Sequence, residues 1–109
     1  MSTPTQRLAE LGLTLPPVAK PLAAYTPAIT VGNQVWVSGQ LPLRDGKLVA
    51  TGRLGDAVEP AEGAEAAKVA ALNALAAVAD QAGGLDNVAR ILKAVVFVAS
   101  TTDFTAQPQ

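Results

Sequence analysis

The feature that most constrains the fold is residues 60–82, which carry the signals of one long α-helix. Pro60 suits the first helical turn, where its missing N–H leaves no hydrogen bond unmade, and Gly83-Gly84 follow the last periodic position. Apolar residues recur at three- and four-residue spacing: Val69, Leu72, Ala76 and Ala79. This narrow stripe of mostly small side chains suits a helix that packs closely on a β-sheet.

The helix does not have the pattern of a membrane span. Charged residues leave only residues 69–79 uncharged, whereas a span needs about 20 consecutive apolar residues. Arg7 and Glu10 interrupt a weakly apolar N-terminal stretch, which argues against a secretion signal. The sequence therefore predicts a cytoplasmic protein with no membrane partner.

A β-hairpin is predicted where the turn pair Gly32-Asn33 joins the runs 29–31 and 35–37. Asp45-Gly46 is a second turn signal, and residues 47–50 are predicted to return as a third strand of a meander or its close relative. Short helical segments are predicted at both flanks, over residues 5–12 and within 85–90.

Residues 91–99 are a nearly continuous apolar run, which predicts a strand covered on both faces. One helix covers only one face, so further chain or a second subunit is predicted to cover the other. Trp36 and Phe97 are assigned to the core, because alternation and an aromatic content of 4% explain both.

Composition excludes several classes of function. The 109 residues predict one domain that buries roughly two-thirds of its unfolded surface. The net charge is −1 and the eight basic residues are scattered, so no basic surface favours a nucleic-acid partner. The absence of cysteine and histidine removes disulfides, thiolate nucleophiles, the usual general base and the commonest metal ligands. Any catalysis must use carboxylates, hydroxyls, backbone groups and water.

Polar residues at the end of the second hairpin run are the candidate site. Ser38, Gly39 and Gln40 bring a hydroxyl, a bare backbone and an amide to a strand end, where sites are commonly built. The alternative for Ser38 is a hydroxyl bonded to backbone at a strand terminus. Tyr25 is the single tyrosine, and its alternative is a buried aromatic with a satisfied hydroxyl.

Several motifs occur in a recognisable order. They are Tyr25, Gly32-Asn33, the run Val-Ser-Gly-Gln-Leu-Pro at 37–42, Asn73 in the middle of the helix, the run Lys-Ala-Val-Val-Phe-Val at 93–98, and Asp103-Phe104. This order resembles the Rid family of reactive-intermediate imine deaminases, whose members are often labelled endoribonuclease L-PSP. The N-terminal extension and the long loop before the helix resemble a longer bacterial branch of that family.

The resemblance implies an α/β (α+β) fold of the bacillus chorismate mutase-like type. In it, an antiparallel or mixed sheet is packed by one long helix, and homotrimers place ligand sites between subunits. It implies hydrolysis of 2-imino or enamine acids to 2-keto acids and ammonia, with no cofactor and no metal. Tyr25 matches the family tyrosine that lines the cleft, and Ser38 with Gly39 matches the pair that borders the ligand. These three are the predicted substrate-binding residues, and no catalytic residue is assigned.

The chain is expected to be a single Rid-like domain, 1–109, with an N-terminal extension, 1–19, and a family-like core, 20–105. Family members continue with another helix and two strands, which supply a carboxylate-gripping arginine and a water-positioning acid. The arginines of this chain do not match that position: Arg7, Arg44, Arg53 and Arg90. We therefore expect a truncated form that lacks deaminase activity. Two other functions are considered, a non-catalytic metabolite-binding or regulatory protein and, third, an endoribonuclease.

Overall fold

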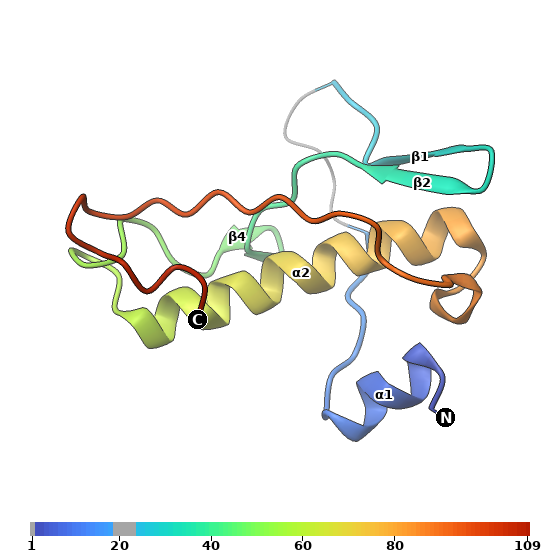
Figure 1. Ribbon diagram of the computed structural model, residues 1–109, viewed down its shortest axis with the longest axis horizontal. Coiled ribbons are helices and arrows are strands. Elements are labelled where there is room, and N and C mark those ends of the chain that lie inside the picture. The colour runs from blue at the N-terminus through green and yellow to red at the C-terminus, as the bar shows by residue number, and fades with distance from the viewer. Residues whose placement is uncertain (1, 19–23) are drawn as a thin grey trace.

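The computed structural model describes residues 2–18 and 24–109. The elements in order are α1 (Pro4–Glu10), β1 (Ala28–Val31), β2 (Gln34–Val37), β3 (Leu43–Arg44), β4 (Lys47–Leu48), α2 (Pro60–Ala82) and a 3-10 turn, η1 (Leu85–Asn87). The long helix α2 forms the axis of the molecule, with the β1–β2 hairpin beside its C-terminal half (Figure 1). After η1 the chain runs back along α2 toward the N-terminal end of that helix (Figure 1). The predicted α+β class is confirmed, whereas the predicted core boundary at residue 20 lies outside the described residues.

The helix predicted over residues 60–82 is confirmed as α2 (Pro60–Ala82). At its start the backbone N–H of Glu59 donates to the Glu62 carboxylate at 3.2 Å. At its end Gly83 takes a left-handed conformation, φ 77°, and its N–H donates to the Ala79 carbonyl. The buried positions are Val69, Asn73, Ala76 and Ala77, so a polar residue lies within the apolar stripe.

The predicted hairpin is also confirmed. β1 and β2 pair antiparallel with Ile29 opposite Trp36, and Gly32 at the turn has a φ of 60°. One face of the hairpin packs on α2, where the Thr30 hydroxyl donates to the Gln81 side-chain oxygen at 2.8 Å. The opposite face is open to solvent, and Trp36 is 62% exposed there. The assignment of Trp36 to the core is therefore wrong, because the described chain places nothing over this outer face.

The third predicted strand, 47–50, is shorter than expected. β4 ends at Leu48 and pairs only with β3, through a turn in which Asp45 and Gly46 both have positive φ values, 54° and 78°. That conformation is the type I′ turn that an Asp-Gly pair favours. β3 and β4 form a second two-stranded sheet, separate from β1–β2, so the predicted meander is wrong among the described strands.

The strand predicted over residues 91–99 is not present. Within the described chain, residues 89–98 make no backbone hydrogen bond, and pairing begins only where Leu54 N–H donates to the Ala99 carbonyl at 2.9 Å. Phe97 is 94% exposed, so its assignment to the core is wrong as well. The physical reason is that a strand exists only as part of a hydrogen-bonded ladder, and the described residues supply no neighbouring strand here.

The N-terminal helix predicted over residues 5–12 is observed as α1, and Gly12 in a left-handed conformation, φ 71°, follows it. The backbone N–H of Thr5 donates to the Asp86 carboxylate at 2.8 Å, which joins α1 to η1. Among the residues that the structure describes, no helix has the length and apolarity needed to cross a membrane.

Candidate functional site

The end of β2 is fixed to the segment that precedes β1. The Ser38 backbone N–H donates to the Pro27 carbonyl at 2.9 Å. The Ser38 hydroxyl lies 2.9 Å from the same carbonyl and 3.0 Å from the Thr26 carbonyl, so it donates its proton to backbone. The alternative considered for Ser38, a hydroxyl bonded to backbone at a strand terminus, is therefore observed. Because a hydroxyl also has two acceptor lone pairs, Ser38 can still accept a hydrogen bond from a ligand.

A shallow pocket of about 380 Å³ lies at this junction. Its lining residues are Thr26, Ala28, Ile29, Trp36, Val37 and Ser38. None of the six is a charged residue, and the two largest, Ile29 and Trp36, are cross-strand partners in the hairpin. The pocket therefore combines an apolar wall with hydroxyl groups at one edge.

Tyr25 precedes Thr26, whose carbonyl accepts from Ser38, so the chain brings it to the same junction. Its side chain is 44% exposed, and the alternative of a buried core aromatic is therefore wrong. Tyr25 is not among the residues that line the pocket. The structure thus brings the Ser38 side chain to the pocket and does not include Tyr25 in its lining.

Neither backbone conformation nor lack of space explains the glycine at position 39. Its φ lies outside the left-handed region, and a Cβ added to it meets no atom within 4 Å. Its N–H makes no backbone hydrogen bond within residues 2–18 and 24–109. An exposed N–H beside open space can donate to a small ligand or to a neighbouring subunit.

Asn73 is a positioning residue whose role the sequence did not reveal. It lies in α2, is 2% exposed, and its amide nitrogen donates to the carbonyls of Leu41 and Leu43 at 3.0 and 2.9 Å. These bonds fix the chain that leaves Ser38-Gly39-Gln40 against the helix. The available signal was a lone amide among apolar helix positions, which has to find partners when it is buried.

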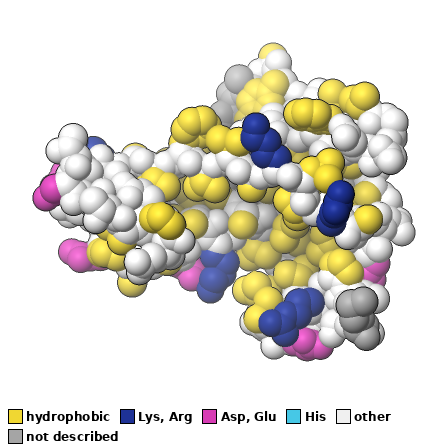
Figure 2. Space-filling view, viewed as in Figure 1, with side chains coloured by type: hydrophobic (Ala, Val, Ile, Leu, Met, Phe, Trp, Pro, Cys, Tyr) yellow, Lys and Arg dark blue, Asp and Glu magenta, His cyan; other side chains and the backbone are white. Residues whose placement is uncertain are grey.

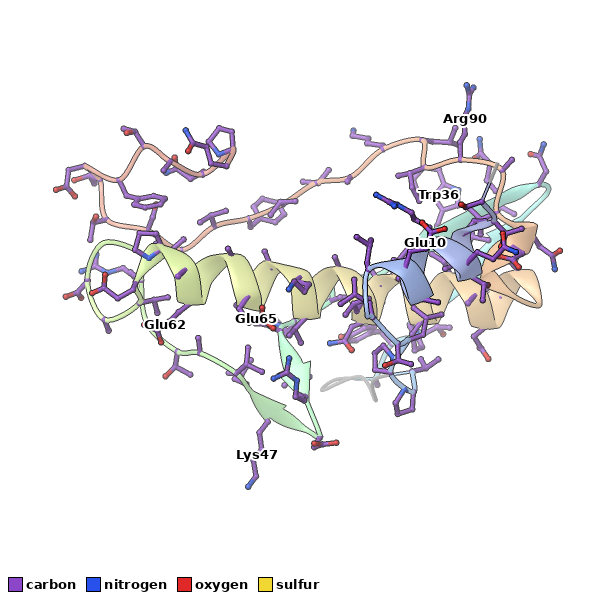
Figure 3. The ribbon with its side chains drawn as sticks, turned by 90° about the horizontal axis from the view of Figure 1, so that it is seen from below. Glu10, Trp36, Lys47, Glu62, Glu65 and Arg90 are labelled. Carbon is purple, nitrogen blue, oxygen red and sulfur yellow. The ribbon has the colours of Figure 1, made fainter. Side chains whose placement is uncertain are left out.

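Three of the four arginines predicted not to serve as a substrate anchor pair with carboxylates. Arg7, Arg44 and Arg53 lie 3.0, 3.4 and 3.6 Å from the carboxylates of Glu10, Glu65 and Asp56. A hydrogen bond from Lys68, together with the charges of Lys68 and Arg44, lowers the pKa of Glu65. Lys47 and Arg90 project away from α2 on opposite sides of the molecule (Figure 3). The described residues contain no group of three or more potential metal ligands.

A long helix packed on a β-hairpin, with a Ser-Gly pair at the strand end, is an α+β arrangement. Residues 5–103 match the family described as "YjgF/chorismate mutase-like, putative endoribonuclease". The chain belongs to this family, which agrees with the resemblance to Rid proteins drawn from the motifs.

Three relatives show the extent of the likeness. The chain is 40% identical to Protein TCP17 of Trypanosoma cruzi over 100 residues, which are 92% of this chain and 62% of that protein. A crystal structure from Agrobacterium tumefaciens, of a protein with unknown function, matches with a TM-score of 0.81 and 45% identity over 94% of this chain and 62% of that one. A second crystal structure, named a putative endoribonuclease from Shewanella oneidensis, matches with a TM-score of 0.71 and 43% identity over 77% of this chain and 56% of that one. The chain thus spans less than two thirds of the length of each relative.

Proposed function

We propose that the whole protein hydrolyses reactive 2-imino acids, and the enamines in equilibrium with them, to 2-keto acids and ammonia. The observation that carries this proposal is the strand end Ser38-Gly39, where an exposed N–H adjoins a pocket without charged lining residues. The resemblance of the motif order to imine deaminases supports it, and residues 5–103 match the YjgF/chorismate mutase-like family.

The reaction asks little of the protein. A protonated imine carbon is already electrophilic, so water adds to it and gives a carbinolamine. Transfer of a proton to nitrogen then lets ammonia leave as the C–N bond breaks and the C=O bond forms. The balance is one iminium and one water to one ketone and one ammonium ion. The rate enhancement comes from the orientation of substrate and water, which does not require histidine or cysteine, and this chain has neither residue.

The residues at the junction have separate roles in this proposal. The Gly39 N–H donates to the bound acid, Ser38 holds the strand end and accepts from the ligand, and Tyr25 forms the margin of the cleft. The group that binds the substrate carboxylate comes from elsewhere in the protein, in line with a homotrimer that has sites between its subunits. The exposed apolar outer face of the hairpin supports such an assembly, since a large apolar surface commonly marks an interface. We further propose a cytoplasmic protein that works without cofactor or metal.

The test is the loss of an imine generated in place by an amino-acid oxidase, with semicarbazide as the trap for imine that remains. We expect the protein to lower the amount trapped, and Gly39→Ala to remove most of that effect because the new methyl group enters the ligand space. Asn33→Ala, a change at the exposed hairpin turn, is the matched control and keeps the activity. Imine loss at the spontaneous rate with the intact protein would overturn the proposal.

Endoribonuclease activity is the second candidate, because the family description and one structural relative carry that name. A net charge of −1 and the absence of histidine weigh against it. Cleavage of RNA by the purified protein, with binding that weakens steeply as salt rises, would favour this function. Thermal stabilisation by a keto acid without any turnover would instead indicate a metabolite-binding protein.

A further inference from the structure

We propose that the β3–β4 turn is a site of spontaneous covalent modification, at which Asp45 is converted to isoaspartate through attack by the Gly46 nitrogen. Asp45 is the single aspartate of the chain that a glycine follows. The modification is a property of the folded turn and does not depend on imine hydrolysis.

The reaction joins the side chain of Asp45 to the backbone that follows it. The Gly46 nitrogen attacks Cγ of the protonated Asp45 carboxyl group, a C–N bond forms, and one water leaves to give a cyclic succinimide. Water then adds to either ring carbonyl. Opening at Cγ restores aspartate, whereas opening at the α-carbonyl leaves the main chain running through Cβ and Cγ, which is isoaspartate. One water is lost and one is gained, so the conversion needs no oxidant and no co-reactant besides water.

Both reacting groups are accessible in this turn. The Gly46 N–H makes no backbone hydrogen bond within residues 2–18 and 24–109. Asp45 is exposed and takes part in none of the ion pairs among these residues. A Cβ added to Gly46 meets no atom within 4 Å, so no neighbouring group hinders the attack.

The other aspartates lack this combination. Each is followed by a residue that carries a side chain, which crowds the nitrogen that has to attack. Two of them are also held by partners. Asp56 lies 3.6 Å from the Arg53 guanidinium, and Asp86 accepts from the Thr5 N–H at 2.8 Å. The structure therefore singles out one aspartate.

The turn is strained and has little support. Asp45 is the single non-glycine residue of the described chain with a positive φ, 54°, and this backbone region is unfavourable for residues with a Cβ, although aspartate tolerates it better than most. The β3–β4 ladder has two residue pairs, extended by a bond from the Val49 N–H to the Pro42 carbonyl, whereas β1–β2 has four pairs. So short a hairpin is marginally stable. The Asp45 side chain can therefore reach the Gly46 nitrogen without unfolding of the rest of the molecule.

Isoaspartate changes the geometry of the hairpin. It adds one carbon to the main chain of the turn, and the backbone of a two-residue turn fixes the register of the strands that it joins. We expect the pairing of Arg44 with Lys47 to be lost. The bond from Asn73 to the Leu43 carbonyl remains, because it lies outside the turn. The change is therefore confined to β3–β4.

Ageing of the purified protein tests the inference. The folded protein is kept at neutral pH for several weeks, and isoaspartate is measured by transfer of a labelled methyl group from S-adenosylmethionine, catalysed by an isoaspartyl methyltransferase. We expect the label to rise with time. Asp45→Glu should lose most of this rise, since the longer side chain has to close a larger ring. Asp56→Glu is the matched control, at an exposed aspartate followed by alanine, and should keep the full rise.

Persistence of the rise in Asp45→Glu, or its loss in Asp56→Glu, would place the modification elsewhere and overturn the inference. The initial rate is also measured in protein unfolded by guanidinium chloride. Isoaspartate that forms only in the unfolded chain would show that the fold protects the turn, which overturns the inference as well. In the aged, folded protein we expect the amides of Arg44 and Lys47 to exchange faster than in fresh protein, with those of β1–β2 unchanged. Unchanged exchange at Arg44 and Lys47 in the labelled molecules would contradict the expected loss of the ladder.

Discussion

Two apolar, β-prone regions of this molecule behave differently. The hairpin β1–β2 and the run 91–99 are both rich in β-branched and apolar residues, and both follow signals that favour strands. The hairpin forms a complete ladder of four residue pairs. The run stays extended without hydrogen-bonded neighbours across residues 89–98 of the described chain.

The difference lies in where the partner comes from. Each hairpin strand finds its partner two residues away, through a turn that its own sequence encodes. The run 91–99 has no such neighbour, and its large side chains are exposed: Ile91, Leu92, Val95, Val96 and Phe97. Apolar side chains lie open over the middle of the molecule (Figure 2). A high β-propensity therefore shows that a segment can form a strand, but the hydrogen-bonded partner strand has to come from another segment.

The largest effect is expected where α2 holds the chain that leaves the hairpin. Asn73→Leu removes the donor for the Leu41 and Leu43 carbonyls and leaves both without their partner. We expect a loss of about 3 kcal/mol in the free energy of unfolding, measured by urea denaturation. Ser38 and Gly39 precede this anchor, so ligand binding falls as well.

Asn87→Ala is the matched control for that variant. Asn87 is exposed, and its amide makes one hydrogen bond, to the Ala82 carbonyl at 2.9 Å. Its removal is expected to cost less than about 1 kcal/mol. Equal losses in the two variants would show that burial of Asn73 does not set the strength of the anchor.

The next effect concerns the turn that gives the hairpin its local partner. Gly32→Val forces a β-branched residue into a φ of 60° and is expected to cost about 1–2 kcal/mol in the free energy of unfolding. Gly39→Ala is the control within the same region, because its backbone is not left-handed and its Cβ has open space. Thermal unfolding should place Gly39→Ala within about 0.5 kcal/mol of the parent protein. Similar destabilisation by both changes would contradict this account of the turn.

The sequence predicts best what local chemistry determines. The helix 60–82 and both turns follow from proline, glycine and periodicity, which act within a few residues, and all three are observed. The residues of the run 91–99 do not by themselves determine whether the run forms a strand. A strand there requires a hydrogen-bonding neighbour far along the chain or outside it. The alternation of residue types along the hairpin also led to the wrong assignment of Trp36. Alternation shows that the two faces of a strand differ, but not which face other residues cover.

The candidate site shows the same division. The strand end Ser38-Gly39 follows from the hairpin signal, and the structure places Ser38 at a pocket. Thr26 and Trp36 line the same pocket because the segment before β1 is hydrogen-bonded to the end of β2. No short sequence motif encodes that contact. The anchor made by Asn73 joins positions about thirty residues apart, as the separation of 30 to 32 from its acceptors shows.

A smaller effect is expected in the unpaired run. Phe97→Ser should change the free energy of unfolding by less than about 0.5 kcal/mol, because a side chain that is 94% exposed loses few contacts. Amide hydrogen exchange gives the direct comparison, with β1–β2 amides protected and those of residues 89–98 exchanging near the unfolded rate. Protection across the run would show that it had found a partner strand, and Phe97→Ser would then weaken that association.

The smallest effect is expected at the start of the unpaired run, where η1 is held by α1. The backbone N–H of Thr5 lowers the pKa of Asp86 below its ordinary value of 3.8. Since the folded pKa is the lower one, the bond stabilises the contact fully above the unfolded pKa and is lost as the pH falls through the folded value. The amide signal of Thr5 should therefore shift below about pH 3.8. Asp86→Asn should remove this transition, whereas Asp80→Asn, at an exposed position of α2, should keep it. A transition that persists in Asp86→Asn would assign the acid sensitivity of α1 to another group. The hydrogen bond between α1 and η1 would then not be what fixes the chain just before the unpaired run.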